Sequence, residues 1–248
     1  MRNAPEIAQV ATDHRRVIAI DGPAAAGKST VARLLADRLG ALLFDTGALY
    51  RAVALAALRS GVSAEDERAL AKLAVDAQIS VRPPSLRDGR LYDVWLNGED
   101  VTWTLRDAEV GAIVSRVAER PAVRAALLPL QRKIASGDPV VMVGRDIGTV
   151  VVPDAGLKIY LDAAPEERAR RRFREAAARG STQSFEAVLG ETLQRDAIDS
   201  GRRTAPLRPA WDAVRINTDG VPIDQIVADI EGLARSERDE MGNPLWPS

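Results

Sequence analysis

The chain has 248 residues, of which 46% are hydrophobic, with 34 basic and 35 acidic side chains. This length suits one α/β domain with a sizeable core, and the balanced charge argues against nucleic-acid and membrane-surface binding. Cysteine is absent, which excludes disulfides and thiol chemistry, and with neither a secretory signal nor a run of about eighteen apolar residues we expect a cytoplasmic protein.

The basic residues are strongly biased toward arginine. Only four of the 34 are lysine, and the rest are arginine, the better bidentate partner for phosphate. A general bias in composition would produce the same excess of arginine. Only the positions of the arginines along the chain can therefore indicate phosphate binding. The single histidine, His14, lies in a stretch at 1–15 that we expect to be a flexible leader, which argues against histidine catalysis and a histidine-rich zinc site.

Alternating apolar runs and helical patterns organise the first half of the chain. An apolar run at 17–20 ends in Asp21-Gly22-Pro23, which predicts a buried strand entering a glycine-rich turn. A second apolar run follows at 41–44. Helices are expected over 29–39, 46–59 and 64–77.

The segment 78–105 changes character. Short β-type runs with turn signals at Pro83-Pro84, Asp88-Gly89 and Asn97-Gly98 predict small antiparallel strands inserted into the main scheme. Beyond the insert the alternation resumes. Strands are expected at 139–143, 157–161 and 213–217, and helices over 108–135, 165–178, 186–198 and 221–235. The polar tail at 236–248 is expected to be flexible. This alternation predicts an α/β fold, a three-layer parallel sheet covered by helices on both faces.

The segment from Gly22 to Ser29 fits the phosphate-loop pattern G-x-x-x-x-G-K-[ST], in its required place between a strand and a helix. Glycines let the backbone wrap phosphates, and amide N–H groups at the helix N-terminus face the anion. Lys28 is expected to reach the β- and γ-phosphate oxygens, and the Ser29 hydroxyl to bind Mg²⁺. Nucleotide binding follows, but the reaction does not, because this loop serves hydrolases, switches and kinases alike.

Three other segments should border the same crevice, because ligands of parallel sheets bind beyond the carboxyl ends of the strands. Asp45 to Arg51 follows the second strand, and Gly144-Arg145-Asp146 follows the strand at 139–143. An arginine at this position suits a second phosphorylated substrate better than a simple hydrolase. Arg195, Asp199 and Arg202 share one helical face, which fits either a binding cluster or an ordinary solvated surface.

Five of the seven residues at 168–174 are arginine. They could form a solvated helix with acidic residues at its N-terminus, or a mobile lid that brings positive charge onto a transferring phosphoryl group. The Arg179-Gly180 break fits a hinge, and the residues alone leave both interpretations open.

Several separated motifs together resemble the bacterial cytidylate kinase family of P-loop nucleoside-monophosphate kinases. They are 18–30, Asp45 to Arg51, Gly144 to Val151, Lys158 to Asp162 with the following Glu166-Glu167-Arg168, and Arg195 to Arg202 with 205–209. The likeness covers roughly 16–235 and includes the insert, where Trp95 to Val101 resembles the bacterial monophosphate-binding insert. It implies one kinase domain with that insert at about 78–105 and a helical lid at about 168–190.

The resemblance implies a (d)CMP kinase that uses Mg²⁺ and ATP, with site residues as follows. ATP would be bound by Gly22, Pro23, Ala24, Ala25, Ala26, Gly27, Lys28, Ser29 and Thr30. CMP would be bound by Asp45, Thr46, Tyr50, Arg51, Ser115, Arg124, Arg145, Asp146, Arg195, Asp199 and Arg202. Among these, Arg51, Arg145 and Arg202 would clamp the phosphate, Ser115, Arg124 and Asp146 would read cytosine, and Arg195 with Asp199 would hold the sugar. The catalytic set would be Lys28, Arg145, Arg202, Arg171 and Arg172.

Two rival readings remain. A kinase of the same architecture could act on another small acceptor, such as UMP, shikimate or gluconate. A catalytically silent nucleotide-binding regulator would keep the loop but need no second arginine cluster. We expect small-molecule partners, ATP and CMP or dCMP, with no nucleic-acid or membrane partner, and a monomeric chain.

Overall fold

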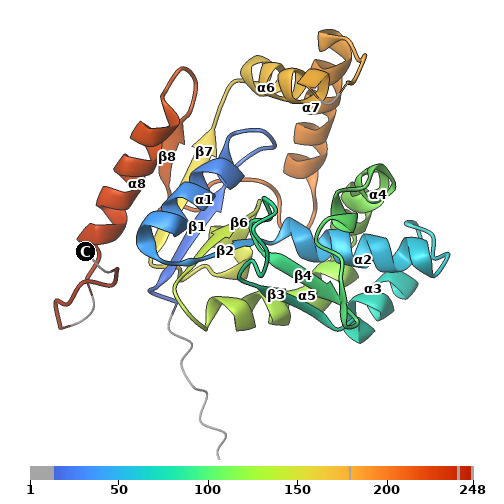
Figure 1. The fold of residues 1–248 in the computed structure, drawn as a ribbon, viewed down its shortest axis with the longest axis horizontal. Helices are drawn as coiled ribbons and strands as arrows, with labels where there is room; N and C mark the ends of the chain where they lie inside the picture. The colour runs from blue at the N-terminus through green and yellow to red at the C-terminus, as the bar shows by residue number, and fades with distance from the viewer. Residues whose placement is uncertain (1–13, 179, 239–240, 247–248) are drawn as a thin grey trace, which may run out of the picture.

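A five-stranded parallel sheet forms the centre of the computed structural model, which describes residues 14–178, 180–238 and 241–246 (Figure 1). The order across the sheet is β2-β6-β1-β7-β8. The strands are β1 (Val17–Asp21), β2 (Leu42–Asp45), β6 (Val140–Val143), β7 (Leu157–Asp162) and β8 (Val214–Asn217). The central strands β1 and β6 are buried on both faces, which explains why they appear in the sequence as continuous apolar runs.

Alternate residues of these strands enter two separate hydrophobic clusters, one on each face. Val17 and Ala19 face a cluster built with α2 (Gly47–Arg59), α4 (Ala108–Glu119) and α5 (Pro121–Ala135). Ile18 and Ile20 face the other cluster, with α1 (Lys28–Leu39) and α8 (Ile223–Ser236). The expected α/β class with helices on both faces is confirmed.

A second, three-stranded antiparallel sheet stands beside α2, as Figure 1 shows. Its strands are β3 (Ile79–Arg82), β4 (Asp93–Leu96) and β5 (Glu99–Asp100), and Asn97-Gly98 makes the tight turn between the last two. Both turn residues have positive φ, 52° for Asn97 and 84° for Gly98, as such a two-residue hairpin requires. The small strands expected within 78–105 are therefore present.

Two expected helices have different limits in the structure. The single helix expected over 108–135 is two helices, because Pro121 excludes the helical conformation at Arg120, whose ψ is 115°. The helix expected at 64–77 is α3 (Glu67–Asp76), which begins later because the Asp66 carboxylate caps it by accepting from the Ala69 N–H at 2.9 Å. A π-helical turn at Ile147–Val151, called η2, was not expected.

Residues near both ends of the described chain are more firmly packed than the sequence indicated, and 1–13 of the expected leader lie outside the described residues. His14 is buried, with its ring Nδ1 2.9 Å from an Asp154 oxygen and Nε2 3.3 Å from the Ser136 hydroxyl, so the expected leader at 1–15 does not extend to His14. Near the other end, Trp246 is 1% exposed and packs into the cluster beneath α1 and α8. The expectation of a flexible tail is wrong for this residue, because its large apolar ring is removed from water.

Two helices project from the sheet at the top of Figure 1, α6 (Pro165–Ala178) and α7 (Phe185–Gly201). They pack on each other, with Phe173 and Phe185 in edge-to-face contact at 6.2 Å between ring centroids. Among the residues that the structure describes, no helix combines the length and apolar character needed to cross a membrane.

Candidate active site

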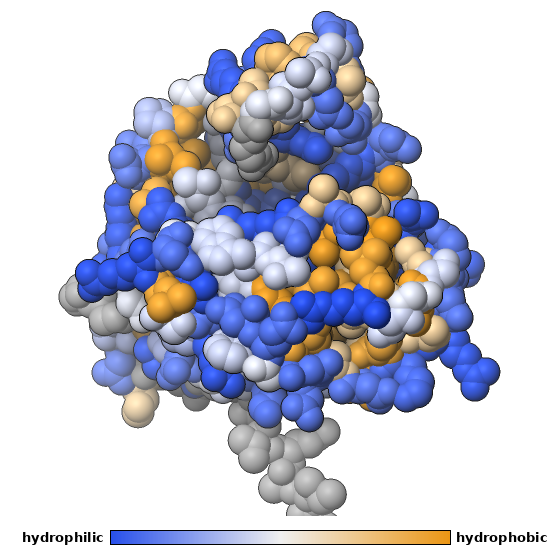
Figure 2. Space-filling view, turned by 45° about the vertical axis from the view of Figure 1, so that its right-hand side comes forward, coloured by the Kyte–Doolittle hydropathy of each residue, from blue (hydrophilic) through white to orange (hydrophobic). Residues whose placement is uncertain are grey.

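Two adjoining hollows open beyond the carboxyl ends of β1, β2 and β6, where parallel sheets bind ligands. Figure 2 shows this face hollowed below the projecting α6–α7 pair. The arginine pocket, of about 250 Å³, is lined by residues that include Asp45, Thr46, Tyr50, Arg51, Ser115, Arg124, Arg145, Asp146, Asp199 and Arg202. The loop pocket, of about 600 Å³, is lined by residues that include Gly27, Thr30, Arg171, Arg172, Thr218, Val221 and Ile223. Both pockets share Ala24, Ala25, Lys28, Ser29 and Arg195.

The phosphate loop joins the two pockets. Gly22 lies so close to the neighbouring strand that a Cβ there would be 2.0 Å from the Leu161 carbonyl oxygen, and Gly27, with φ 90°, turns the chain into α1. Both positions therefore require glycine, for close approach and for a left-handed backbone respectively. Within the expected ATP-binding set, Ala24 to Thr30 line one or both pockets. Gly22 and Pro23 line neither pocket, and their part is to shape the loop.

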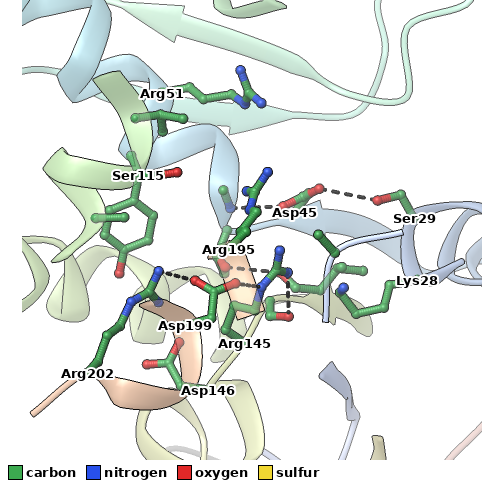
Figure 3. Close-up of a pocket in the computed structure, with 18 of the residues that line it drawn as sticks. Lys28, Ser29, Asp45, Arg51, Ser115, Arg145, Asp146, Arg195, Asp199 and Arg202 are labelled. Atoms are coloured by element: carbon green, nitrogen blue, oxygen red, sulfur yellow. Dashed lines mark hydrogen bonds and ion pairs between the residues drawn. The ribbon is translucent and has the colours of Figure 1, made fainter. Parts of the chain in front are cut away.

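Lys28 is buried and lines both pockets, and Figure 3 shows it among the side chains of the arginine pocket. Its Nζ donates to the Pro23 carbonyl oxygen at 2.6 Å. Burial, together with the positive charge of Arg145, holds the pKa of Lys28 well below its usual value. An ammonium group desolvated in this way gains a great deal from a polyanion placed beside it.

Ser29 and Asp45 face each other across the floor of the arginine pocket. The Ser29 Oγ is 3.5 Å from the Asp45 Oδ2, and the Asp45 Oδ1 accepts from the Gly47 N–H at 2.9 Å (Figure 3). The described residues include no group of three or more acidic or histidine side chains able to cage a metal ion. A hydroxyl with a neighbouring carboxylate instead fits Mg²⁺ held mainly by substrate phosphates and water.

The arginine pocket takes its positive charge from side chains held by one carboxylate. Asp199 accepts from Arg145 Nε at 2.8 Å and pairs with Arg202 through its other oxygen (Figure 3). Burial alone would raise the pKa of Asp199, but the charges of Arg145 and Arg202 outweigh it and lower that pKa. The helical face carrying Asp199 and Arg202 is therefore a buried, paired part of the pocket lining rather than a solvated surface.

Arg195 is the arginine common to both pockets. Burial, and then the charge of Arg145, lower its pKa to about 10. Its Nε is buried without a hydrogen-bond partner, although Asp199 lies close enough to favour the charge. A buried guanidinium with an unsatisfied donor is costly, so this position favours an anion that binds between the pockets.

A second buried ion pair closes the far wall of the arginine pocket. Arg124 donates to Asp146, both side chains are less than a tenth exposed, and the Arg124 guanidinium lies 5.4 Å from the Tyr50 ring centroid. Ser115 reaches the same cavity from α4, beside the apolar side chains Val114 and Ala118. This wall combines an apolar surface with fixed donors and acceptors, as recognition of a planar polar ring requires.

The remaining residues expected to bind CMP also line the arginine pocket. Arg51 donates to the Leu105 carbonyl oxygen at 3.0 Å, which ties α2 to the turn that follows the small sheet. The Thr46 hydroxyl donates to the Val143 carbonyl oxygen at 3.0 Å, and Thr46 lines the arginine pocket. Every residue expected to bind CMP therefore lines one pocket.

The arginine-rich helix α6 is not uniformly exposed. Arg168 is 3% exposed, pairs with Asp196 of α7, and donates to the Ala24 carbonyl oxygen at 3.3 Å, so it is an anchor and not a free lid residue. Arg171 reaches the Thr218 hydroxyl at 3.0 Å, and Arg172 lies 3.5 Å from Glu191. Only Arg171 and Arg172 of this cluster line the loop pocket, and their catalytic role stays a prediction.

Sequence reasoning missed three features of the site. Thr218 donates to the Ala26 carbonyl oxygen at 3.3 Å and accepts from Arg171, and it comes from a loop with no motif. Val221 and Ile223 form an apolar wall of the loop pocket from the start of α8. Asp21, a buried acid at the end of β1, was noticed only as a turn residue, although an acid ending an apolar strand was a usable signal.

A phosphate loop whose cavity joins an arginine-lined second cavity defines a P-loop phosphotransferase with a separate acceptor site. The family model described as cytidylate kinase matches residues 18–236. A cytidylate kinase from Herpetosiphon aurantiacus is 51% identical over 216 residues, 87% of this chain and 93% of the relative.

Two further relatives agree. Cytidylate kinases from Pelotomaculum thermopropionicum and Geobacillus thermodenitrificans are 51% and 50% identical, covering 90% and 88% of this chain and 97% and 96% of the relatives. The chain belongs to the cytidylate kinase family. The resemblance seen in the separated motifs is confirmed over the range in which those motifs lie.

Proposed function

We propose that the two pockets divide a phosphoryl transfer between them, with ATP in the loop pocket and the acceptor nucleotide in the arginine pocket. The chain phosphorylates CMP or dCMP with ATP, giving CDP or dCDP and ADP. The observation that carries the division of roles is the shared border. Lys28, Ser29 and Arg195 line both pockets, so phosphates entering from either side meet at the same charged groups.

The acceptor phosphate binds to the guanidinium groups of Arg51, Arg145 and Arg202. Support comes from Asp199, which orients Arg145 and Arg202 before any ligand arrives. A pre-oriented fork loses little entropy on binding a phosphate and binds it in a bidentate manner. Arg195 and Asp199 contact the sugar in this arrangement, and the position of Arg195 also lets it neutralise charge between the two nucleotides.

The cytosine base binds against the wall formed by Ser115, Arg124 and Asp146. The Asp146 carboxylate accepts from the exocyclic amine of cytosine, and uracil has no such donor. Arg124 supports this role because its buried ion pair holds the Asp146 carboxylate in place. A site built around a hydrogen bond of this kind rejects the analogue that lacks it.

Transfer needs alignment and charge neutralisation rather than a general base, because the acceptor phosphate is already ionised near neutral pH. Lys28, Arg171 and Arg172 line the loop pocket, which holds the phosphoryl donor ATP in this proposal. His14 is bonded to Asp154 and Ser136 and lines neither pocket, so it takes no part. Closure of α6 and α7 over the pockets would exclude water, which otherwise competes as acceptor.

Mg²⁺ bound to the ATP phosphates would supply the charge that offsets the developing negative oxygens. Ser29 would contribute its hydroxyl, with Asp45 next to it. Replacing Ser29 by alanine should raise the Mg²⁺ concentration needed for half-maximal activity, measured at fixed ATP. An unchanged Mg²⁺ requirement would contradict the role of Ser29.

A coupled assay that detects ADP tests the substrate assignment directly. With ATP and Mg²⁺, we expect turnover with CMP and dCMP that exceeds turnover with UMP, shikimate and gluconate. Faster turnover of another acceptor would assign the arginine pocket to that compound. ATP binding without any acceptor turnover would support a nucleotide-binding regulator.

We also propose that the chain acts as a monomer in the cytoplasm. Both pockets are lined by residues of one chain, so a single copy holds a complete site. Sedimentation at working concentration should give the mass of one chain, and an active dimer that loses activity on dilution would contradict this proposal.

A further inference from the structure

Asp21 is the last residue of β1 and precedes Gly22, where the phosphate loop begins. Its side chain is buried. The two carboxylate oxygens accept from the Ile147 N–H and the Gly148 N–H, each at 2.8 Å. One side chain therefore ties the strand that leads into the phosphate loop to the first turn of η2.

The segment held in this way carries groups assigned to the acceptor. Arg145 and Asp146 come directly before Ile147, and both line the arginine pocket. Along the backbone, Gly144 N–H donates to the Ile20 carbonyl oxygen at 3.1 Å, so β1 and the turn after β6 are joined there as well. Beyond this bond the sheet pairing ends, and the Asp21 carboxylate continues the connection.

We infer that Asp21 is a positioning residue that sets the Arg145–Asp146 turn at a fixed distance from the phosphate loop, and so aligns acceptor with donor. The inference rests on the proposed division of the pockets. In-line phosphoryl transfer depends on such alignment, and a displacement of about 1 Å can cost about a hundredfold in rate.

The Asp21 carboxylate makes these contacts from a buried position. Burial raises the pKa of Asp21 to about 6, even though the two N–H bonds oppose that rise. The charged groups nearest to it are Lys28 at the start of α1 and Asp146 before η2, with Tyr160 on the paired strand β7. Lys158 of β7 packs against Gly148 but pairs with Asp212 at 2.6 Å. The fold thus keeps a carboxylate ionised at neutral pH against a desolvation cost.

The glycine opposite the carboxylate supports the same interpretation. A Cβ on Gly148 would lie 3.5 Å from the Asp21 Oδ2 and 3.1 Å from the Lys158 Cδ. The side chains around this position leave little room for a larger residue. Gly148→Ala therefore perturbs the same contact from the other partner.

The first test compares Asp21→Asn with the unaltered chain at pH 7.5. Asparagine keeps the size of the side chain and one acceptor oxygen but turns an amide NH₂ toward the second backbone N–H. We expect kcat to fall about 10- to 100-fold, with the KM values for ATP and CMP changed less than about threefold. The melting temperature should stay within a few degrees, because relief of desolvation offsets the lost hydrogen bond.

The matched control is Asp154→Asn, which alters a carboxylate at the opposite end of the sheet, where Asp154 holds His14. It should leave kcat unchanged. Asp21→Glu restores the charge but not the length, so it should recover less than full activity. In the double variant with Gly148→Ala, the loss should be smaller than the product of the two single losses, since both act on one contact.

The pH profile separates positioning from packing. As pH falls through about 6, Asp21 takes up a proton and keeps an acceptor on one oxygen only, so kcat should fall. The acceptor phosphate also titrates near pH 6 in every variant. The fall of kcat on the acid side of the pH profile should therefore depend on two protonations in the unaltered chain and on one in Asp21→Asn.

The outcomes are distinct. Full kcat in Asp21→Asn, or parallel loss of kcat and melting temperature, would overturn the positioning role. No CMP phosphorylation by the unaltered chain would contradict the proposed function instead. Hydrogen exchange tests the contact independently of catalytic activity. The Ile147 and Gly148 amides should exchange faster in Asp21→Asn than in the unaltered chain, and equal rates would contradict the contact itself.

Discussion

In the arginine pocket three guanidinium groups are held by buried acids, whereas in the loop pocket that of Arg171 is held largely by uncharged groups. Asp199 holds Arg145 and Arg202, and Asp146 holds Arg124. In the loop pocket, Arg171 donates to the Thr218 hydroxyl and carbonyl oxygen and lies within 3.4 Å of the Ala25 carbonyl oxygen, with Glu167 its only acidic contact in the described chain. Acidic partners fix a geometry before binding, and neutral partners are exchanged more easily for phosphate.

We propose that this difference lets the acceptor site be strict about its substrate while the donor site closes over ATP. The arginine pocket is small and pre-organised, which favours discrimination between similar bases. The loop pocket is larger, and two of its arginines, Arg171 and Arg172, come from α6, an element that projects from the sheet (Figure 1). The following changes test whether the two pockets behave as differently as their contacts indicate.

The largest effect is expected at the border between the pockets. Lys28→Ala should lower kcat by about 10²- to 10³-fold, because it removes a preorganised cation from the transferring phosphates. Stability should not fall, since burial already disfavours the Lys28 ammonium in the free enzyme. Steady-state kinetics and thermal melting check both statements. Arg33→Ala, on the same helix but lining neither pocket, is the control, and an active Lys28→Ala variant would remove the loop from the mechanism.

A change in the arginine pocket should alter selectivity. Asp146→Asn should reduce kcat/KM for CMP by about 100-fold and reduce the CMP-to-UMP ratio, because the amide can donate to the uracil carbonyl. Arg124 would keep a neutral acceptor in place of its ionic partner. The ratio is measured with both acceptors at fixed ATP, with the exposed Asp138→Asn as control. An unchanged ratio would assign base recognition to another residue.

The smallest kinetic effect is expected from the loop pocket. Arg171→Ala should lower kcat by about tenfold while KM changes little, because a contact that strengthens in the transition state acts on kcat. Arg170 is the matched control, since it is exposed, pairs with Glu167 at 3.4 Å and lines neither pocket. If Arg171→Ala and Arg170→Ala had the same kinetics, Arg171 would only hold the loop that contains Thr218.

Hydrogen exchange on the same helix checks the movement. With a bisubstrate analogue bound, protection should increase over 170–178 and 180–190, while the turn around Arg168 should change little because this residue is anchored to Asp196. Equal protection with and without the analogue would contradict lid closure.

The strands and the grouping of the site residues could be predicted from the sequence for a simple physical reason. Buried parallel strands appear as short apolar runs, and their carboxyl ends meet at one edge of the sheet, so Lys28, Asp45 and Arg145 had to lie near one another. The roles of these residues in binding CMP came from resemblance and remain predictions. Local spacing also placed Asp199 and Arg202 on one face, but only the contact with Arg145 shows that the face is not a solvated one.

What the sequence could not show depends on contacts between distant segments. Arg168 has the same local surroundings as Arg170, and its burial arises from Asp196, 28 positions along the chain. His14 and Trp246 lie in polar stretches that predict flexible ends, and their packing follows from long-range partners. Pro121, by contrast, is a local signal for a helix boundary. The apolar pattern continues across it, and for that reason one helix was expected over 108–135.

The scarcity of lysine has a consequence for chemical labelling. Lys28 and Lys158 are each 6% exposed, and the Lys158 amine is bonded to Asp212. The other two lysines, Lys72 and Lys133, are exposed on α3 and α5, which pack together, and neither lines one of the two pockets. Among lysine amines, an acylating dye or surface linker would therefore attach to these two helices and leave the lining of both pockets unmodified.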